Sequence, residues 1–297
     1  MLKIGCRLII FCLILVLLFS CSRDRQKPGQ IVAWGSNNYG QLQVPEGQDF
    51  IAISAGLINN LALRQNGSIV LWGRDNDEVT PQGFNFVAID AGWQNHLALR
   101  ADSTLVGWGN DAGYGQLDIP PGNDFVAIAV GDGHSLALKA DGSIAAWGAN
   151  FFNQLAVPEG KDFIAIATGR YHSLALRKDG SIVAWGLNNV GQSDPPYGDN
   201  YIAISAGEFH SLALRKDGSL IAWGDNDFGQ CNVPSGNNFV KISAGRYHSI
   251  ALKSDGSIIP WGDDRYKQTS IIHGNNFVAV SAGDGYNLSL RKVSERS

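Results

Sequence analysis

His172, Ser173 and Asp179 lie close together in the segment 169–192, and they are residue types from which hydrolases build an active site. The apolar run 172–177 predicts a strand, in which successive side chains point to opposite faces. His172 and Ser173 therefore cannot hydrogen-bond as base and nucleophile. The pair also recurs at His134-Ser135, His210-Ser211 and His248-Ser249. We expect no catalytic residues here and interpret the histidines as structural side chains, buried and hydrogen-bonded to neighbouring backbone: His134, His172, His210 and His248.

Metal and cofactor sites are not predicted either. Ligands of a metal must converge within a few Å, and the histidine-bearing segments carry no matching carboxylate or thiol. The segments 75–77 and 225–227 have the Asp-Asn-Asp pattern of calcium ligands but lack the spacing and final Glu of an EF-hand, so we interpret them as turns. No phosphate-binding glycine motif occurs. We therefore expect no enzymatic reaction, no metal and no cofactor.

The dipeptide Trp-Gly recurs through the chain at intervals of 38, 36, 39, 38, 38 and 38 residues. The tryptophans, which we interpret as large packing residues, are Trp34, Trp72, Trp108, Trp147, Trp185, Trp223 and Trp261. The copies divide residues 29–293 into the repeats 29–66, 67–102, 103–141, 142–179, 180–217, 218–255 and 256–293. A period of this size indicates a repeat architecture.

Each copy holds short apolar runs bounded by Gly, Asp and Asn, which favour strands over helices. The runs around 163–169, 172–177 and 181–186, with a shorter one around 154–158, predict four strands, and the Asp-Gly pairs predict a hairpin between the second and third. The fold class is therefore all-β: a seven-bladed β-propeller of four-stranded antiparallel blades. We expect the N-terminal strand at 31–35 to pair with the C-terminal strand at 287–291 and close the ring.

The N-terminus has the pattern of a bacterial lipoprotein signal. Lys3 and Arg7 precede an apolar run from Leu8 to Phe19 that ends in Leu-Phe-Ser-Cys, so residues 1–20 are predicted to be a signal peptide and Cys21 the lipidated residue. Ordinary cleavage and an uncleaved anchor are the alternatives. Residues 21–28 would be a short tether and 294–297 a tail. The protein is then expected in the cell envelope, lipid-anchored and facing the periplasm or the exterior. Cys231, the cysteine left in the repeats, is interpreted as a small apolar core residue.

The overall charge argues against a nucleic-acid partner. Lys and Arg total 23 and Asp and Glu total 27, a formal charge of -4, whereas binding to phosphates requires clustered cations. We expect a monomer.

The phrase GxxHSLALxxDGxVxxWGxNxxGQ resembles the repeat of the regulator of chromosome condensation (RCC1) superfamily across residues 29–293. The compact period looks more like the bacterial branch that includes beta-lactamase inhibitory protein II. This resemblance implies a seven-bladed propeller that binds other proteins through loops on one face. WD-repeat propellers are the alternative architecture, but here Gly rather than Asp follows each repeat Trp.

Up-and-down strands place the first and third turns of each blade on one face and the second and fourth on the other. The first turns vary and carry Ile58, Trp93, Arg170, Tyr171, Glu208, Phe209, Arg246 and Tyr247. The third turns carry Tyr39, Tyr114, Phe152, Phe228, Arg265 and Tyr266. Aromatic residues and Arg often anchor protein interfaces, so these residues form the predicted binding face. For the third-turn group, packing within the turn is the favoured interpretation, because Gly-Gln follows at regular spacing.

The inhibitory protein also uses aromatic residues on such turns. The first turns 57–58, 132–133 and 284–285 depart from that pattern, which argues against a shared target. The leading functional hypothesis is a membrane-anchored, non-enzymatic propeller that binds a protein. A surface lectin or adhesin is the main alternative, because aromatic side chains also stack on sugars. An enzyme or exchange factor is the third.

Overall fold

The computed structural model describes residues 28–74 and 79–293. The predicted signal peptide, Cys21, nearly all of the tether, the turn at 75–77 and the tail lie outside these ranges. Within them, no helix has the length and apolar character needed to cross a membrane. The described residues are all-β, as the sequence predicts.

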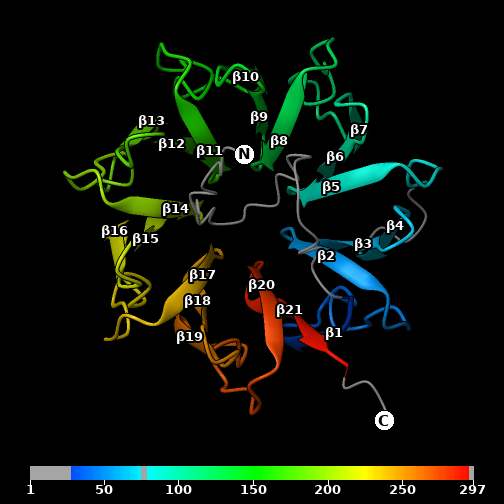
Figure 1. Ribbon diagram of the computed structural model, residues 1–297, viewed down its shortest axis with the longest axis vertical. Helices are drawn as coiled ribbons and strands as arrows, with labels where there is room; N and C mark the ends of the chain where they lie inside the picture. Colours follow the sequence, from blue (N-terminus) through cyan, green and yellow to red (C-terminus); the bar gives the residue numbers. More distant parts are fainter. Residues whose placement is uncertain (1–27, 75–78, 294–297) are drawn as a thin grey trace, which may run out of the picture.

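The strands surround a common axis, and each group of three neighbouring strands has an inner, a middle and an outer strand (Figure 1). The inner strands are β2 (Phe50–Ala55), β5 (Phe86–Ala91), β8 (Phe125–Val130), β11 (Phe163–Thr168), β14 (Tyr201–Ala206), β17 (Phe239–Ala244) and β20 (Phe277–Ala282). The middle strands are β3 (Asn59–Arg64), β6 (Asn95–Arg100), β9 (His134–Lys139), β12 (His172–Arg177), β15 (His210–Arg215), β18 (His248–Lys253) and β21 (Tyr286–Lys292). The outer strands are β4 (Ile69–Gly73), β7 (Leu105–Gly109), β10 (Ile144–Gly148), β13 (Ile182–Gly186), β16 (Leu220–Gly224), β19 (Ile258–Gly262) and β1 (Gly29–Gly35).

The prediction of a fourth strand in each blade is wrong: the sheets have three strands, except that β20-β21-β1 and β2-β3-β4 are joined in one six-stranded sheet. The segment 151–158 shows why. The amide of Phe152 donates to Gln154 Oε1 and that of Leu155 donates to Asn150 Oδ1, so both bond locally. The Gln154 carbonyl accepts the Trp185 indole N–H, and Pro158 has no N–H to donate. These groups are therefore not free to form a ladder.

The predicted Asp-Gly hairpins between the middle and outer strands are present. Asp179 Oδ1 accepts from both the amide and the hydroxyl of Ser181, at 2.8 and 2.7 Å. Gly180 has a φ of 92°, a conformation that L side chains rarely adopt. One pair of middle and outer strands differs, because middle strand β21 and outer strand β1 come from opposite ends of the chain. They pair antiparallel from Gly29↔Lys292 to Gly35↔Tyr286.

The core lies between successive sheets. The first five residues of every middle strand are buried, because a sheet packs on each of its faces, and this is why Leu-Ala-Leu in HSLALR does not alternate with polar residues. The repeat tryptophan packs against the preceding sheet: Trp185 of β13 joins Leu136 and Leu138 of β9 and Phe163 of β11. Its indole N–H donates to Gln154, in the loop that follows β10.

A circle of glycines surrounds the axis at the ends of the inner strands. Its members are Gly56, Gly92, Gly131, Gly169, Gly207, Gly245 and Gly283. A Cβ added to any of them would lie 2.3 to 2.7 Å from the carbonyl oxygen of the next, and Gly283 is followed by Gly56. Such contacts are far shorter than a real Cβ allows, so only glycine permits the inner strands to approach the axis this closely.

Candidate functional site

The histidines of the middle strands are buried, as expected, but their partners are not the backbone groups that we predicted. Nε2 of His172 is hydrogen-bonded to Ser211 Oγ at 2.9 Å, and Nε2 of His134 to Ser173 Oγ at 2.8 Å. His210 bonds Ser249 in the same way, and His248 bonds Asn287. Each His therefore contacts the middle strand of the next sheet. Its partner there is the residue directly after that strand's own His or Tyr, whose side chain lies on the opposite face of the strand and points toward the preceding sheet. Each His and its partner are fully buried, so the motif joins neighbouring sheets within the core.

Burial depresses the pKa values of these imidazoles. Desolvation lowers the pKa of His134 and His248 to about 4. Desolvation, with repulsion from neighbouring histidines, lowers the pKa of His172 and His210 to about 3. The histidines are neutral at pH 7, which suits hydrogen bonding to hydroxyl groups.

We expect His172→Asn to weaken the acid sensitivity of the protein. In the unfolded chain His172 has a pKa of about 6.5. Below that pH its imidazole is protonated in the unfolded state but remains neutral in the folded state, which favours unfolding. The contribution of His172 to the free energy of unfolding is therefore fully present above pH 6.5, and it is smaller by about 2 kcal/mol at pH 5. Denaturant unfolding of wild type and variant at pH 7.5 and pH 5 measures this difference, with exposed His273→Asn as the control. If the free energy of unfolding fell by the same amount between pH 7.5 and pH 5 in wild type and in His172→Asn, the lowered pKa of His172 would be contradicted.

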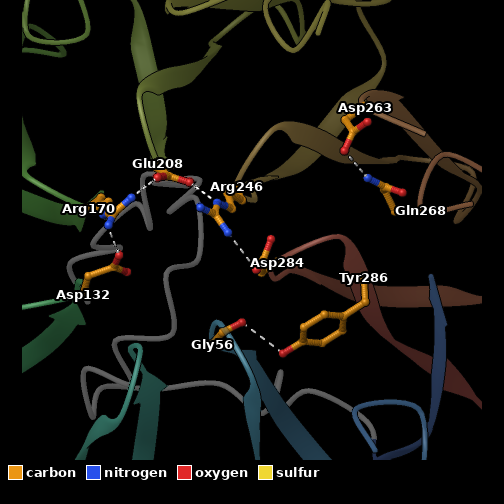
Figure 2. Close-up of polar contacts among 9 residues, drawn as sticks. All are labelled: Gly56, Asp132, Arg170, Glu208, Arg246, Asp263, Gln268, Asp284 and Tyr286. Carbon is orange, nitrogen blue, oxygen red and sulfur yellow. Dashed lines mark hydrogen bonds and ion pairs between the residues drawn. The ribbon is translucent and has the colours of Figure 1, made fainter. Parts of the chain in front are cut away.

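Five charged side chains of alternating sign form an arc around one end of the central axis (Figure 2). Each comes from one of five consecutive first turns. Arg170 Nε lies 3.3 Å from Asp132 Oδ2, and Arg246 Nη1 lies 3.1 Å from Asp284 Oδ2. Glu208 forms ion pairs with both Arg170 and Arg246 and is buried between them. We call these five residues, in the order Asp132, Arg170, Glu208, Arg246 and Asp284, the axial arc.

The axial arc is partly desolvated. Burial raises the pKa of Asp132 to about 6, with Arg170 opposing the shift, and burial also raises the pKa of Asp284. For Arg246, burial acts to lower the pKa, but Asp284 and Glu208 outweigh it and raise the pKa further above its ordinary value. The arc residues line a cavity of about 100 Å³ together with Leu57 and the glycine circle. Drug-sized ligands occupy pockets of roughly 300 to 1,000 Å³, so this cavity suits a single side chain better than an organic substrate.

Aromatic side chains of the first and third turns lie beside the axial arc, where Tyr171 contacts Arg170 and Tyr247 contacts Arg246. Phe152 of one third turn contacts Tyr171 of the next sheet's first turn, with ring centroids 5.1 Å apart, and Phe228 contacts Tyr247 at 5.0 Å. The Arg265 guanidinium lies 4.6 Å from the Phe228 ring centroid. We call this surface the aromatic crown; it comprises Phe152, Tyr171, Phe209, Phe228, Tyr247, Arg265 and Tyr266.

Exposure separates the predicted binding residues into groups. Ile58 is only 4% exposed, so its assignment to the binding face is wrong: its side chain is not available to a partner. Tyr171, Phe209 and Tyr247 are half-buried, whereas Trp93 is 43% exposed. The third-turn aromatics, for which we favoured packing, are the more exposed group: Tyr39, Tyr114, Phe152, Phe228 and Tyr266 range from 39% to 52%. In Phe152, Phe228 and Tyr266 the backbone amide donates to Oε1 of the Gln two residues later, a contact that holds the turn without burying the ring.

The repeat tryptophans occupy the expected packing positions. Trp34, Trp72, Trp108, Trp147, Trp185 and Trp261 are buried, and Trp223 is half-buried.

Cys231 is half-buried, and burial with the nearby Asp225 raises its pKa to about 11, so it is a protonated thiol at neutral pH. Among residues 28–74 and 79–293, no group of His, Cys, Asp and Glu side chains is arranged to hold a metal ion.

Sequence reasoning missed the axial arc and the glycine circle as units. Arg170, Glu208 and Arg246 were assigned to the binding face, but Asp132 and Asp284 were treated only as departures from an aromatic pattern. The signal was available: in five consecutive copies, the residue after the Gly that follows the inner strand alternates in charge. Recognising it requires knowing that these positions meet at the axis.

Comparisons with known proteins agree on the fold. The regulator of chromosome condensation (RCC1) repeat matches residues 125–154, 163–192, 201–230 and 239–268. No curated protein matches the sequence. Prp20p from Saccharomyces cerevisiae, described with its binding to Gsp1p and histones, is 21% identical, with 91% of this chain and 93% of that chain covered and a TM-score of 0.77. Human WBSCR16 is 15% identical, with 90% and 100% covered and a TM-score of 0.75. The ectodomain of the Physcomitrella patens receptor kinase CR4 is 21% identical, with 79% and 68% covered and a TM-score of 0.66.

Proposed function

Because this chain carries RCC1 repeats in an RCC1-type propeller, we propose that it is a non-enzymatic binding protein whose aromatic crown holds a protein partner. The observation that carries the proposal is the cluster of exposed aromatic rings around the axial arc. Large aromatic side chains and Arg supply much of the binding energy of protein interfaces. The opposite face of the described residues exposes Phe84 and Tyr197, which make no ring contacts with each other.

We further propose that the propeller has seven blades and that β1 closes the ring against β21. Several contacts across this junction support closure. The amide of Ala55 in β2 donates to Ser281 Oγ in β20, matching the Ala244 to Ser205 bond between β17 and β14. The Tyr286 hydroxyl, at the position of the histidines, donates to the Gly56 carbonyl at 3.0 Å. The first contact repeats one that joins other neighbouring sheets, and the second links the position of the histidines to the next sheet through a different acceptor.

The small cavity and the buried histidines support a binding role over catalysis. The axial arc carries charged groups, but each is engaged in an ion pair within the arc. Prp20p is described as binding Gsp1p and histones, so proteins are among the partners of one propeller of this fold. The identity of that chain to this one is too low to carry those partners across.

We expect alanine at Phe152, Phe228 or Tyr266 to weaken partner binding by about 1 to 3 kcal/mol with little loss of thermal stability. The exposed edges of these rings contribute more to an interface than to the core. Full-length chain would be used to capture envelope proteins, and affinity for the captured protein would then be measured by calorimetric titration. Tyr197→Ala, on the opposite face, is the matched control.

Unchanged capture by the three crown variants, or a fall in melting temperature without loss of affinity, would refute the proposed binding face. A glycan array with the same variants separates the alternative. Crown-dependent glycan binding without protein capture would favour a lectin.

We also propose that the protein is lipid-anchored outside the cytoplasm, on the basis of the Leu-Phe-Ser-Cys sequence after an apolar run. Several acyl chains at about 0.8 kcal/mol per buried CH₂ would retain it on a membrane. Metabolic labelling with a palmitate analogue should tag the wild type, and Cys21→Ser should lose both the label and membrane retention. A labelled Cys21→Ser protein, or a soluble wild type, would exclude lipidation at Cys21.

A further inference from the structure

The two faces of the propeller differ in charge. The upper face comprises the first turns, which carry the axial arc, and the third turns, which carry the exposed aromatics. Its described residues contain ten carboxylates and five cationic groups, a formal charge of -5. The carboxylates are Asp111, Asp118, Asp132, Asp194, Glu208, Asp225, Asp227, Asp263, Asp264 and Asp284, and the cations are Arg74, Arg170, Arg246, Arg265 and Lys267.

The lower face, formed by the second and fourth turns, is balanced. Its described residues carry eleven carboxylates and eleven cationic groups. Many of these charges are paired locally: Arg64 with Asp49 at 2.5 Å, and Lys161 with Asp141 at 2.8 Å. Among the described residues, the excess of negative charge is therefore concentrated on the face that also holds the aromatic crown.

The axial arc is open on one side. Glu208 has two arginine partners, whereas Asp132 and Asp284 stand at the two ends with one each. The first turns that would continue the circle carry Leu57 and Trp93, which bring no cation (Figure 2 shows the arc open toward Gly56). The arc thus holds three carboxylates and two guanidinium groups, so it lacks one positive charge.

We infer that the upper face binds its partner through a basic surface, one of whose lysine or arginine side chains enters the axial cavity between Asp132 and Asp284, beside Leu57. The inference rests on the proposed function and names the class of partner. Three features select a cation. The cavity has the size of a side chain, the arc is one cation short, and exposed aromatic rings attract ammonium and guanidinium groups. Tyr171 and Tyr247 already receive Arg170 and Arg246 in this way, at 4.9 and 5.0 Å.

The probe for this inference is a fluorescent octalysine peptide, measured by anisotropy against the full chain in zwitterionic detergent. We expect binding that weakens with salt, and about tenfold weaker binding by the double variant Asp132→Asn/Asp284→Asn. The control is Asp102→Asn/Asp217→Asn, which changes net charge equally but lies in second turns on the lower face. A second variant, Leu57→Arg, would supply the missing cation from within the chain and should also weaken octalysine binding.

Equal weakening by the upper-face and lower-face pairs would show nonspecific attraction and overturn the inference. So would octaglutamate binding as tightly as octalysine, or tight octalysine binding by Leu57→Arg with an unchanged melting curve. The capture experiment separates the two proposals. If Asp132→Asn/Asp284→Asn retains the native partner while crown alanine variants lose it, the cation inference is wrong and the proposed function stands. If the crown alanine variants retain the native partner, the proposed function is wrong, whether or not octalysine binds to the upper face.

Discussion

Deletion of residues 29–35 should abolish cooperative folding. Strand β1 supplies the whole outer edge beside β21, and it carries Ile31 and Trp34, both buried. Trp34 also donates its indole N–H to the Gln268 carbonyl, 234 residues away in sequence. Loss of the Trp side chain alone costs about 3 to 5 kcal/mol, and domains are stable by only about 5 to 15 kcal/mol. Denaturant unfolding followed by circular dichroism should show a broad transition at low denaturant.

A circular permutant provides the matched control. Gly29 and Lys292 are antiparallel partners, so one Asp inserted between Lys292 and Gly29 would recreate the Lys-Asp-Gly turn that joins β12 to β13. New termini in the exposed loop around Tyr197 leave every strand intact. The permutant should unfold at or above the wild-type denaturant concentration, because the junction becomes covalent. A deletion variant as stable as wild type would show that β1 contributes nothing to closure.

Trp185→Ala should lower the free energy of unfolding by about 3 to 5 kcal/mol. The indole is 8% exposed and packs on the preceding sheet, so its removal leaves a cavity between two sheets. It also leaves the Gln154 carbonyl without its 2.7 Å donor in the turn that carries Phe152. Trp185→Phe, which fills most of the volume but lacks the N–H, should lose roughly 1 to 3 kcal/mol.

Urea unfolding of these two variants and of exposed Tyr197→Ala tests the assignment. Tyr197→Ala should remain within about 0.5 kcal/mol of wild type. If Trp185→Ala were as mild as Tyr197→Ala, the repeat tryptophan would not be a packing residue. If Trp185→Phe were as damaging as Trp185→Ala, the hydrogen bond to Gln154 would outweigh the packing.

Features encoded within one repeat could be predicted from the sequence. The alternation of apolar runs and Asp-Gly turns predicted the hairpins, because a turn such as Asp179-Gly180 depends on local backbone conformation and on the Ser181 contacts. The recurrence of Trp-Gly predicted a repeat architecture and the packing role of residues such as Trp185. The prediction of a fourth strand was wrong for a reason that is only partly local, because the Gln154 carbonyl accepts a hydrogen bond from the indole of Trp185 in the next copy.

The sequence by itself determined an all-β repeat protein with buried histidines, packing tryptophans and one variable face, because these follow from strand periodicity and turn chemistry. Only the tertiary structure decided which residues meet. His172 bonds Ser211, the axial arc links Asp132 to Asp284 through Arg170, Glu208 and Arg246, and Ile58 is buried while Phe152 is exposed. Each of these outcomes depends on the rotation between sheets, which brings positions about one repeat apart within hydrogen-bond distance. No pattern within a single repeat encodes that rotation.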